Sequence, residues 1–208
     1  PGEEKEIVLL LGWGANRDDA QALLKKYRTV DISAAFADVK QYWDETLGAL
    51  QIKTPDPEMD VLVNRWLLYQ TLSCRIWGRA GFYQASGAYG FRDQLQDGMA
   101  LTHARPAIVR EHLLRAAGRQ FSEGDVQHWW LPENGKGIRT RISDDKSWLA
   151  YVAAQYVETT GDNSVLDEQL AFISGPPLRE GEQDSFYQPG ISAERASLYE
   201  HCARALDA

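Results

Sequence analysis

The chain of 208 residues is long enough to bury a substantial core, as one domain or as one domain with an appended piece. Its apolar and charged fractions, 44% and 25%, are those of a globular protein and exclude a disordered chain. The formal net charge of -8 would repel nucleic acid and anionic lipid, so nucleic acid is not an expected partner.

Membrane and disulfide signals are weak. The longest apolar run, 7–11, is far too short to span a bilayer, and the first residues lack the layout of a signal peptide. Cys74 and Cys202 are widely separated and lie in helix-like patterns, which gives little support to a disulfide framework or a zinc site. These features predict a soluble protein of a reducing compartment, the cytoplasm.

The first segment, "EKEIVLLLGWG", predicts a short buried strand at 7–11 that is ended by glycines. It has no partner strand before it, so we expect the sequence to begin inside a larger protein. A helix is predicted over 16–28, with Asn16 as its N-cap and Asp18 and Asp19 in its first turn. A second helix is predicted over 33–50.

The segment "QIKTPDPEMD" is the clearest boundary. Thr54 and Asp56 are capping candidates, and Pro57 suits the first helical turn, so the main domain is expected to begin here. A long core helix is predicted over 58–77. Its apolar positions recur at helical spacing: Met59, Leu62, Val63, Trp66, Leu67 and Leu72.

Beyond this helix, long and short connections alternate. Helices are predicted over 93–104, 106–119, 147–160, 165–172 and 192–206. The long loops are 78–92, 120–145 and 174–191. Short turns join antiparallel helix pairs and long loops gather at the other end, which predicts a mainly α fold of helical hairpins such as part of an α/α toroid. The last helix stops without a cap at Ala208, so we also expect the C-terminus to be cut.

The long loops share one mixture of side chains. Carboxylates and guanidinium groups hold vicinal hydroxyls through paired hydrogen bonds, and aromatic rings stack on the apolar faces of pyranose rings. This mixture therefore favours a sugar site. Its members include Tyr89, Arg92, Gln96, Asp97, Trp129, Asp144 and Asp145.

Simpler interpretations remain open for each motif. "GFRDQLQD" also suits a helix N-terminus with Asp93 in the first turn and Arg92 in a surface ion pair. "RTRISDD" suits a salt-bridge cluster that orders its own loop. In "DVQHWW" the two adjacent tryptophans cannot both enter one core, which favours a cleft lining, while His128 is either a packed ring or a phosphate or hydroxyl contact.

Other functional motifs are missing. The sequence has no Walker loop, GxGxxG, H-E-x-x-H or G-x-S-x-G string, which disfavours metal and nucleotide roles. Trp66, Tyr69 and Trp77 lie at helical spacing and are expected in the core.

The strings "SGAYGFRDQLQD", "EGDVQHWW", "RTRISDDKSWL" and "SAERASLYEHCARALD" resemble those of the glycoside phosphorylases related to cellobiose and chitobiose phosphorylase, glycoside hydrolase family 94. The resemblance is greatest to the phosphorylase-like region of cyclic β-1,2-glucan synthases and to β-1,2-oligoglucan phosphorylases. It implies that 1–14 ends a β-sandwich domain, that 15–54 is a helical linker, and that 55–208 is the first half of an (α/α)6 catalytic barrel.

The resemblance also implies an inverting reaction on β-linked glucans, with inorganic phosphate as co-substrate and no cofactor or metal. Phosphate attacks the anomeric carbon of the non-reducing glucosyl unit, one carboxylic acid protonates the leaving oxygen, and α-glucose 1-phosphate departs. Arg92 and Asp97 match the arginine and aspartate that hold this unit. Tyr89, Gln96, Trp129, Asp144 and Asp145 are further candidates for lining the cleft.

One departure from the family pattern is important. The family's general acid lies in a "DWND"-type motif that does not occur in these 208 residues, and its phosphate-binding histidine and threonine lie further downstream. No catalytic acid is therefore assigned, and the chain alone is expected to lack phosphorolytic activity. Two other functions stay open: a non-catalytic carbohydrate-binding module, and an inverting hydrolase that would pair Asp144 with Asp97.

The expected partners are a β-glucan oligosaccharide and the remainder of the parent chain. Half a barrel would expose apolar helix faces, which predicts poor solubility without that remainder. The sequence leaves open the glucan linkage, a homodimer, and an anchor of the parent in the inner membrane.

Overall fold

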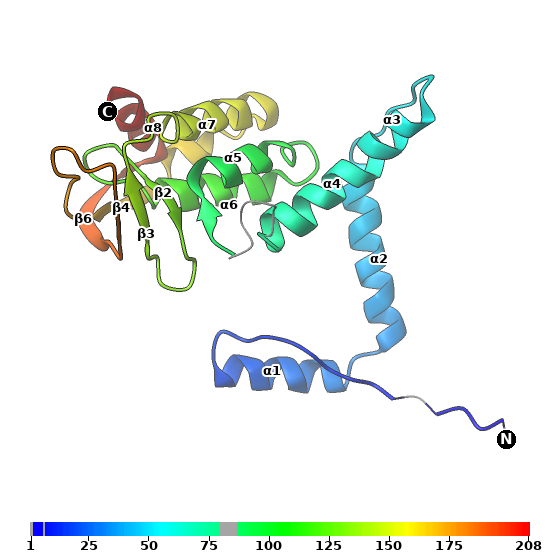
Figure 1. Ribbon diagram of the computed structural model, residues 1–208. Coiled ribbons are helices and arrows are strands. Elements are labelled where there is room, and N and C mark those ends of the chain that lie inside the picture. Colours follow the sequence, from blue (N-terminus) through cyan, green and yellow to red (C-terminus); the bar gives the residue numbers. More distant parts are fainter. Residues whose placement is uncertain (1, 6, 80–86) are drawn as a thin grey trace. The chain divides into compact units, whose positions relative to one another are not determined.

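The computed structural model describes residues 2–5, 7–79 and 87–208, and it divides into two compact units, Pro1–Glu45 and Thr46–Ala208 (Figure 1). About half of the chain is helical, and short antiparallel strands make up a smaller part. The predicted fold class, mainly α, is therefore confirmed.

The first unit is built on α1 (Arg17–Arg28) and most of α2 (Ile32–Gly48). Asn16 caps α1 as predicted, because its side chain accepts a hydrogen bond from the backbone N–H of Asp19 at 3.0 Å. The predicted helix at 33–50 forms as α2, within two residues at each end.

Residues 7–11 do not form the predicted strand. They pair with no other segment of the described residues, and Ile7, Leu9 and Leu11 are exposed. A strand needs a neighbouring strand to satisfy its backbone N–H and C=O groups. Leu10 and Tyr27 instead line a hollow of about 530 Å³ beside α1. The assignment of 1–14 to a β-sandwich and of 15–54 to a linker stays a prediction.

The predicted long helix belongs to the second unit. Asp56 caps it by accepting hydrogen bonds from the N–H groups of Glu58 and Met59, and Pro57 occupies its first turn, as the sequence predicts. The helix changes its hydrogen-bond register twice along its length. In order its parts are α3 (Pro57–Val61), the π-helical η1 (Leu62–Trp66), α4 (Leu67–Gln70) and the π-helical η2 (Thr71–Trp77).

The buried face of this long helix agrees with the predicted one at Leu72 and differs from it at most other positions. Leu68, Leu72 and Ile76 are buried, whereas most of the positions expected in the core are exposed. Helical spacing identifies an apolar stripe but does not show where along the helix a neighbour packs against it. The exposed positions are Met59, Leu62, Trp66, Leu67, Tyr69 and Trp77.

The core of the second unit lies among helices that pack pairwise: α5 contacts α6 and α7, α6 contacts α7, and α7 contacts α8. The predicted helix at 147–160 has the observed bounds, and it ends where Gly161 adopts a left-handed conformation with φ of 72°. The bounds are α5 (Phe91–Met99), α6 (Pro106–Ala117), α7 (Ser147–Thr160) and α8 (Leu198–Asp207).

The long loops contain strands that the sequence analysis missed. One antiparallel sheet has the order β1-β2-β3-β5, and a second pairs β4 with β6. Figure 1 labels β2, β3, β4 and β6. The strands of the first sheet are β1 (Tyr89–Gly90), β2 (Gln127–Trp130), β3 (Gly137–Thr140) and β5 (Asp184–Tyr187), and those of the second are β4 (Gln169–Ser174) and β6 (Gly190–Ser197). Of the predicted loop 78–92, residues 80–86 lie outside the described residues.

Two predicted helices are wrong because part of each segment forms a strand. The segment 165–172 divides between a 3₁₀ turn, η3 (Asn163–Asp167), and β4. The predicted helix at 192–206 begins only at Leu198, because Ser197 is the true N-cap and accepts a hydrogen bond from the Glu200 N–H at 3.2 Å. Pairing with β4 holds the preceding residues as a strand, which overrides their local helix propensity.

Candidate functional site

The candidate site forms where β1 passes into α5. Gly90 has an extended backbone and lies opposite Trp129 on β2. The chain then turns into α5, with Phe91 fully buried, Arg92 exposed, and Asp93 in the first helical turn. An acidic side chain is favourable at this position because the helix dipole places positive charge there.

Arg92 and Asp144 form the outer part of the site. Nη1 of Arg92 donates to Oδ2 of Asp144 at 3.0 Å, and their side chains are 46% and 52% exposed. This hydrogen bond raises the pKa of Arg92, with burial acting in the opposite direction. An exposed ion pair contributes little to stability, so a ligand can exchange with it at low cost.

Asp145 and His128 form the inner part. Nδ1 of His128 lies 2.6 Å from Oδ2 of Asp145, whose side chain is only 4% exposed. The hydrogen bond with Asp145 raises the pKa of His128, while burial opposes the shift. Asp93 adds to the rise and Arg92 reduces it, so the two pairs lie within electrostatic range of each other.

Asp97 lies one turn after Asp93 on α5, and residues four apart share a helix face. Its Oδ2 accepts a hydrogen bond from Nε of Arg75 at 2.8 Å. Burial raises the pKa of Asp97, and Arg75 partly counters that rise. Gln96, the other candidate on this helix, is exposed.

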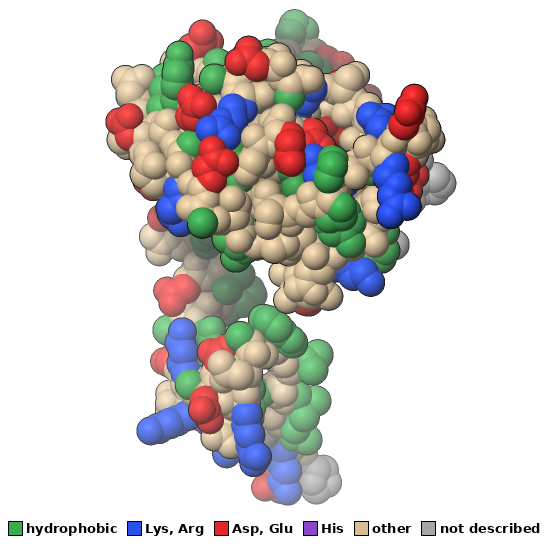
Figure 2. Space-filling view, turned by 90° about the vertical axis from the view of Figure 1, so that its left-hand side faces the viewer, with side chains coloured by type: hydrophobic (Ala, Val, Ile, Leu, Met, Phe, Trp, Pro, Cys, Tyr) green, Lys and Arg blue, Asp and Glu red, His purple; other side chains and the backbone are tan. Residues whose placement is uncertain are grey.

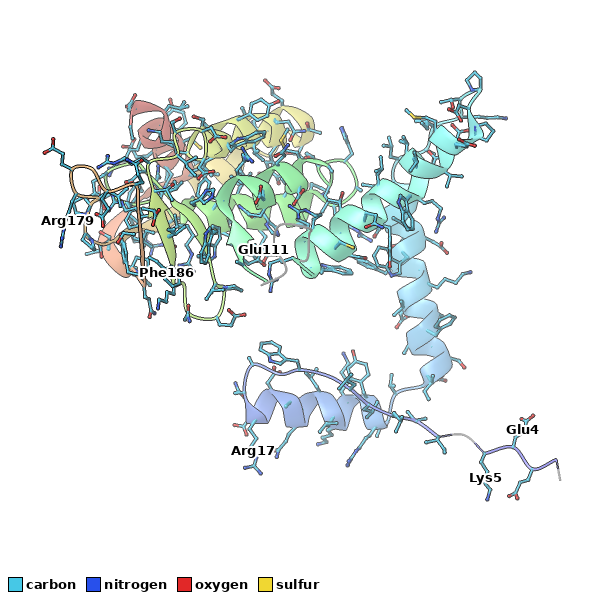
Figure 3. All side chains as sticks on the ribbon, in the orientation of Figure 1. Glu4, Lys5, Arg17, Glu111, Arg179 and Phe186 are labelled. Atoms are coloured by element: carbon cyan, nitrogen blue, oxygen red, sulfur yellow. The ribbon has the colours of Figure 1, made fainter. Side chains whose placement is uncertain are left out.

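The two adjacent tryptophans point to opposite faces of β2, as the sequence analysis expects. Trp130 is buried, whereas Trp129 is partly exposed and its ring centroid lies 5.4 Å from that of Phe186. Phe186 is exposed on the edge strand β5, where Figure 3 labels it. The register aligns Trp129, Ile138 and Phe186 across the sheet.

Tyr89, like Asp145, is a buried candidate. It lies on the strand face that it shares with Trp130, and the guanidinium groups of Arg79 and Arg115 each lie 4.7 Å from its ring centroid. Nearby, His112 is also buried, and burial together with these two arginines lowers its pKa to about 3. The structure therefore separates Tyr89 from Arg92, although they are three residues apart.

The loop 139–145 does not form the internal salt-bridge cluster that "RTRISDD" suggested as an alternative. Arg139 is buried and pairs with Asp125 and Glu123, and Arg141 donates to backbone carbonyls, those of Glu182 and Arg179 among them. Both aspartates of the string instead pair outside the loop, with Arg92 and His128. Figure 2 shows acidic and basic side chains intermingled on one face of the molecule.

A hollow of about 410 Å³ lies beside the segment 139–146. Its lining includes Asp125, Arg139, Arg141 and Lys146, but neither Asp144 nor Asp145. Within the described ranges, no group of three or more His, Cys, Asp or Glu side chains is placed to hold a metal ion. Among the residues that the structure describes, no helix is long and apolar enough to cross a membrane.

Arg75 and Phe186 join the site although the sequence analysis did not select them. Arg75 lies within an apolar helical pattern that reads as core, and Phe186 lies in a segment read as loop. A contact that spans 22 residues, such as Arg75 with Asp97, leaves no local pattern in the sequence.

Comparisons with known proteins identify the group to which this site belongs. The chain is 49% identical over 206 residues to the cyclic beta-(1,2)-glucan synthase NdvB of Rhizobium meliloti (strain 1021), a match that covers 99% of this chain and 7% of that protein. It is 31% identical over 236 residues to the N,N'-diacetylchitobiose phosphorylase of Vibrio proteolyticus, a match that covers 100% of this chain and 27% of that protein. It is 29% identical over 178 residues to the solabiose phosphorylase of Paenibacillus borealis, a match that covers 83% of this chain and 21% of that protein.

The chain thus spans about a quarter or less of the length of these relatives, which are a glucan synthase and two phosphorylases. The family model described as "Glycosyl hydrolase 94 superfamily, catalytic domain" matches residues 42–208, which include every residue of the candidate site. The chain belongs to the catalytic domain of the glycosyl hydrolase 94 superfamily.

Proposed function

We propose that this chain holds the non-reducing glucosyl unit of a β-linked glucan, as part of an inverting carbohydrate phosphorylase or glycosyltransferase. The observation that supports this most is the meeting of Arg92 with Asp144, and of His128 with Asp145, at the first turn of α5. The β-1,2 linkage is the favoured one, since the relative at 49% identity is a cyclic beta-(1,2)-glucan synthase.

The side chains at this place suit a sugar better than an ion. A guanidinium donates several hydrogen bonds in a plane, carboxylates accept from hydroxyls, and Trp129 offers a partly exposed ring for the apolar face of a pyranose. The ion pair of Arg92 with Asp144 leaves both side chains about half exposed, so that hydroxyls can replace that contact.

In this reaction phosphate, the co-substrate, attacks the anomeric carbon from the face opposite the leaving oxygen, which a carboxylic acid protonates. The glucosyl ring must be held still while both bonds change, and that is the role we assign to Arg92 and Asp97. The exposed Gln96 and Asp144 line the same cleft, while the buried Asp145, through His128, and the buried Tyr89 support it. No residue of this chain takes the role of the general acid.

Sugar binding can be tested directly by calorimetry on the 208-residue chain with a β-1,2-linked glucose oligosaccharide. Arg92→Ala is expected to weaken binding at least tenfold, because a hydrogen bond to a charged group is lost. Arg195→Ala is the matched control, since Arg195 is also exposed and donates to a backbone carbonyl on β4. Equal affinity in the wild type and the Arg92 variant would contradict the proposed site.

Catalysis is tested separately with the same oligosaccharide and inorganic phosphate. The chain alone is expected to release no glucose 1-phosphate, because it supplies no general acid. Release of glucose 1-phosphate would refute that part of the proposal, and release of free glucose without phosphate would identify a hydrolase instead. Oligosaccharides with β-1,3 and β-1,4 linkages, compared in the binding experiment, test the linkage preference.

A further inference from the structure

Arg75 is a charged side chain on the long helix that no motif of the sequence distinguishes. We propose that Arg75 is a positioning residue for Asp97, holding its carboxylate ionised and oriented so that its second oxygen accepts a glucosyl hydroxyl. This inference rests on the proposed sugar-binding role of Asp97, and it assigns the helix 57–77 a part in the site.

The geometry of the pair supports this role. Nε of Arg75 donates to Oδ2 of Asp97 at 2.8 Å, and their side chains are 30% and 23% exposed. Among the described residues, Oδ1 of Asp97 has no hydrogen-bond partner. This oxygen is also not buried, because the buried side-chain atom without a partner in this part of the chain is Oε1 of Gln127. One carboxylate oxygen is therefore fixed, while the other is accessible to a ligand.

The helix that carries Arg75 is anchored on both sides of it. Leu72 and Ile76 are buried, and η2 packs directly against α5, the helix of Asp97. Arg75 lies in the middle of the π-helical segment Thr71–Trp77. π-Helical turns frequently occur at functional sites, because the extra residue redirects side chains from their α-helical positions.

The charges around Asp97 explain why a cation is needed. Burial raises the pKa of Asp97, and Asp93, one turn earlier on α5, raises it further. Arg75 opposes both effects through its hydrogen bond and its charge. Among the described residues, Arg75 on η2 and Asp93 on α5 are the charged groups that act on this carboxyl. A protonated carboxyl is a poorer acceptor for hydroxyls than a carboxylate.

Two measurements test the proposal on the 208-residue chain. The first is an NMR titration of the Asp97 carboxyl, assigned by comparison with Asp97→Asn. The second is the affinity for a β-1,2-linked glucose oligosaccharide as a function of pH. The variants are Arg75→Gln, Arg75→Lys and the matched control Arg110→Gln. Arg110 is also an arginine with 30% side-chain exposure in ion pairs, but it lies on α6 and pairs with Asp162 and Glu168.

We expect Arg75→Gln to raise the pKa of Asp97, to weaken glucan binding about tenfold, and to move the pH at which binding is half lost upwards. Arg75→Lys keeps a positive charge and should restore part of each effect. Arg110→Gln should change neither. A purely structural role for Arg75 would lower stability without moving the titration of Asp97.

The inference is overturned if the Asp97 titration is the same in Arg75→Gln as in the wild type, or if glucan affinity and its pH dependence are unchanged in Arg75→Gln but lost in Asp97→Asn. If the wild type and Arg110→Gln both fail to bind the oligosaccharide at any pH, the proposed function fails. In that case the NMR titration tests only the electrostatic effect of Arg75 on Asp97. A raised pKa of Asp97 in Arg75→Gln supports this effect, and an unchanged pKa refutes it.

Discussion

Arg92 and Arg139 carry the same guanidinium group, yet the structure gives them opposite roles. Arg92, at the start of α5, is 46% exposed, and among the described residues it makes one hydrogen bond, to Asp144. Arg139, on β3, is 3% exposed and makes five, two of them to Asp125, while its guanidinium lies 3.8 Å from the ring centroid of Phe121. A cation whose donors are saturated stabilises the fold, and only one with free donors can bind a ligand.

The largest expected effect is on stability. Arg139→Ala should lower the free energy of unfolding by about 3–5 kcal/mol, because it leaves Asp125 half-buried without its partner. Arg92→Ala should change that free energy by less than about 0.5 kcal/mol, since its ion pair is exposed. Urea denaturation of the two variants gives both values. Similar losses of unfolding free energy would contradict the different roles of Arg92 and Arg139.

A smaller effect separates Tyr89 from the exposed candidates. Tyr89→Phe removes the hydroxyl that accepts a hydrogen bond from Nη1 of Arg79 at 3.2 Å, which should cost about 1 kcal/mol of stability. Affinity for a β-1,2-linked glucose oligosaccharide should not change, because the ring is buried. A tenfold weaker affinity at unchanged stability, measured by calorimetry and denaturation, would place Tyr89 in the cleft after all.

The smallest effect concerns the pH dependence of stability. Because Asp145 raises the pKa of His128, the protonated ring stabilises the folded state. This contribution is fully present below the unfolded-state pKa of about 6.5 and is lost as pH rises through the raised folded-state value. His128 is 38% exposed, so water screens the pair and the contribution should stay below about 0.5 kcal/mol.

His128→Gln tests this dependence. The stability advantage of the wild type over His128→Gln should be largest at acidic pH and should shrink as pH increases, as measured by urea denaturation at several pH values. An advantage that grew with pH would show that the neutral ring is the favoured form, and the ion pair with Asp145 would then be wrong.

Local signals predicted the ends of several helices, because the groups that form those ends lie close together in the sequence. The caps at Asn16 and Asp56 and the glycine end at Gly161 form hydrogen bonds within four residues, so the sequence alone shows them. The strands were missed because their partners are distant: β3 pairs with β5, and Ile138 lies opposite Phe186 across 48 residues. In β6, pairing overrode a helix-like composition.

For the candidate site, too, local sequence patterns predicted one part, and contacts between distant segments decided the rest. The residue types in "GFRDQLQD" and "RTRISDD" indicated sugar chemistry, and Arg92 does meet Asp144. The sequence analysis could not distinguish Arg92 from Arg139, or Trp129 from Trp130, because burial depends on the packing of other segments. Arg75 was missed for the same reason, since its partner lies on another helix.

By itself, the sequence determined the mainly α class, the helix ends at Asn16, Asp56 and Gly161, and the family. Only the tertiary structure decided which strands pair, that Tyr89 is buried, that Trp129 stays partly exposed, and that Arg75 reaches Asp97. The physical reason is range: propensity and capping act over a few residues, whereas burial and ion pairing depend on segments that only folding brings together.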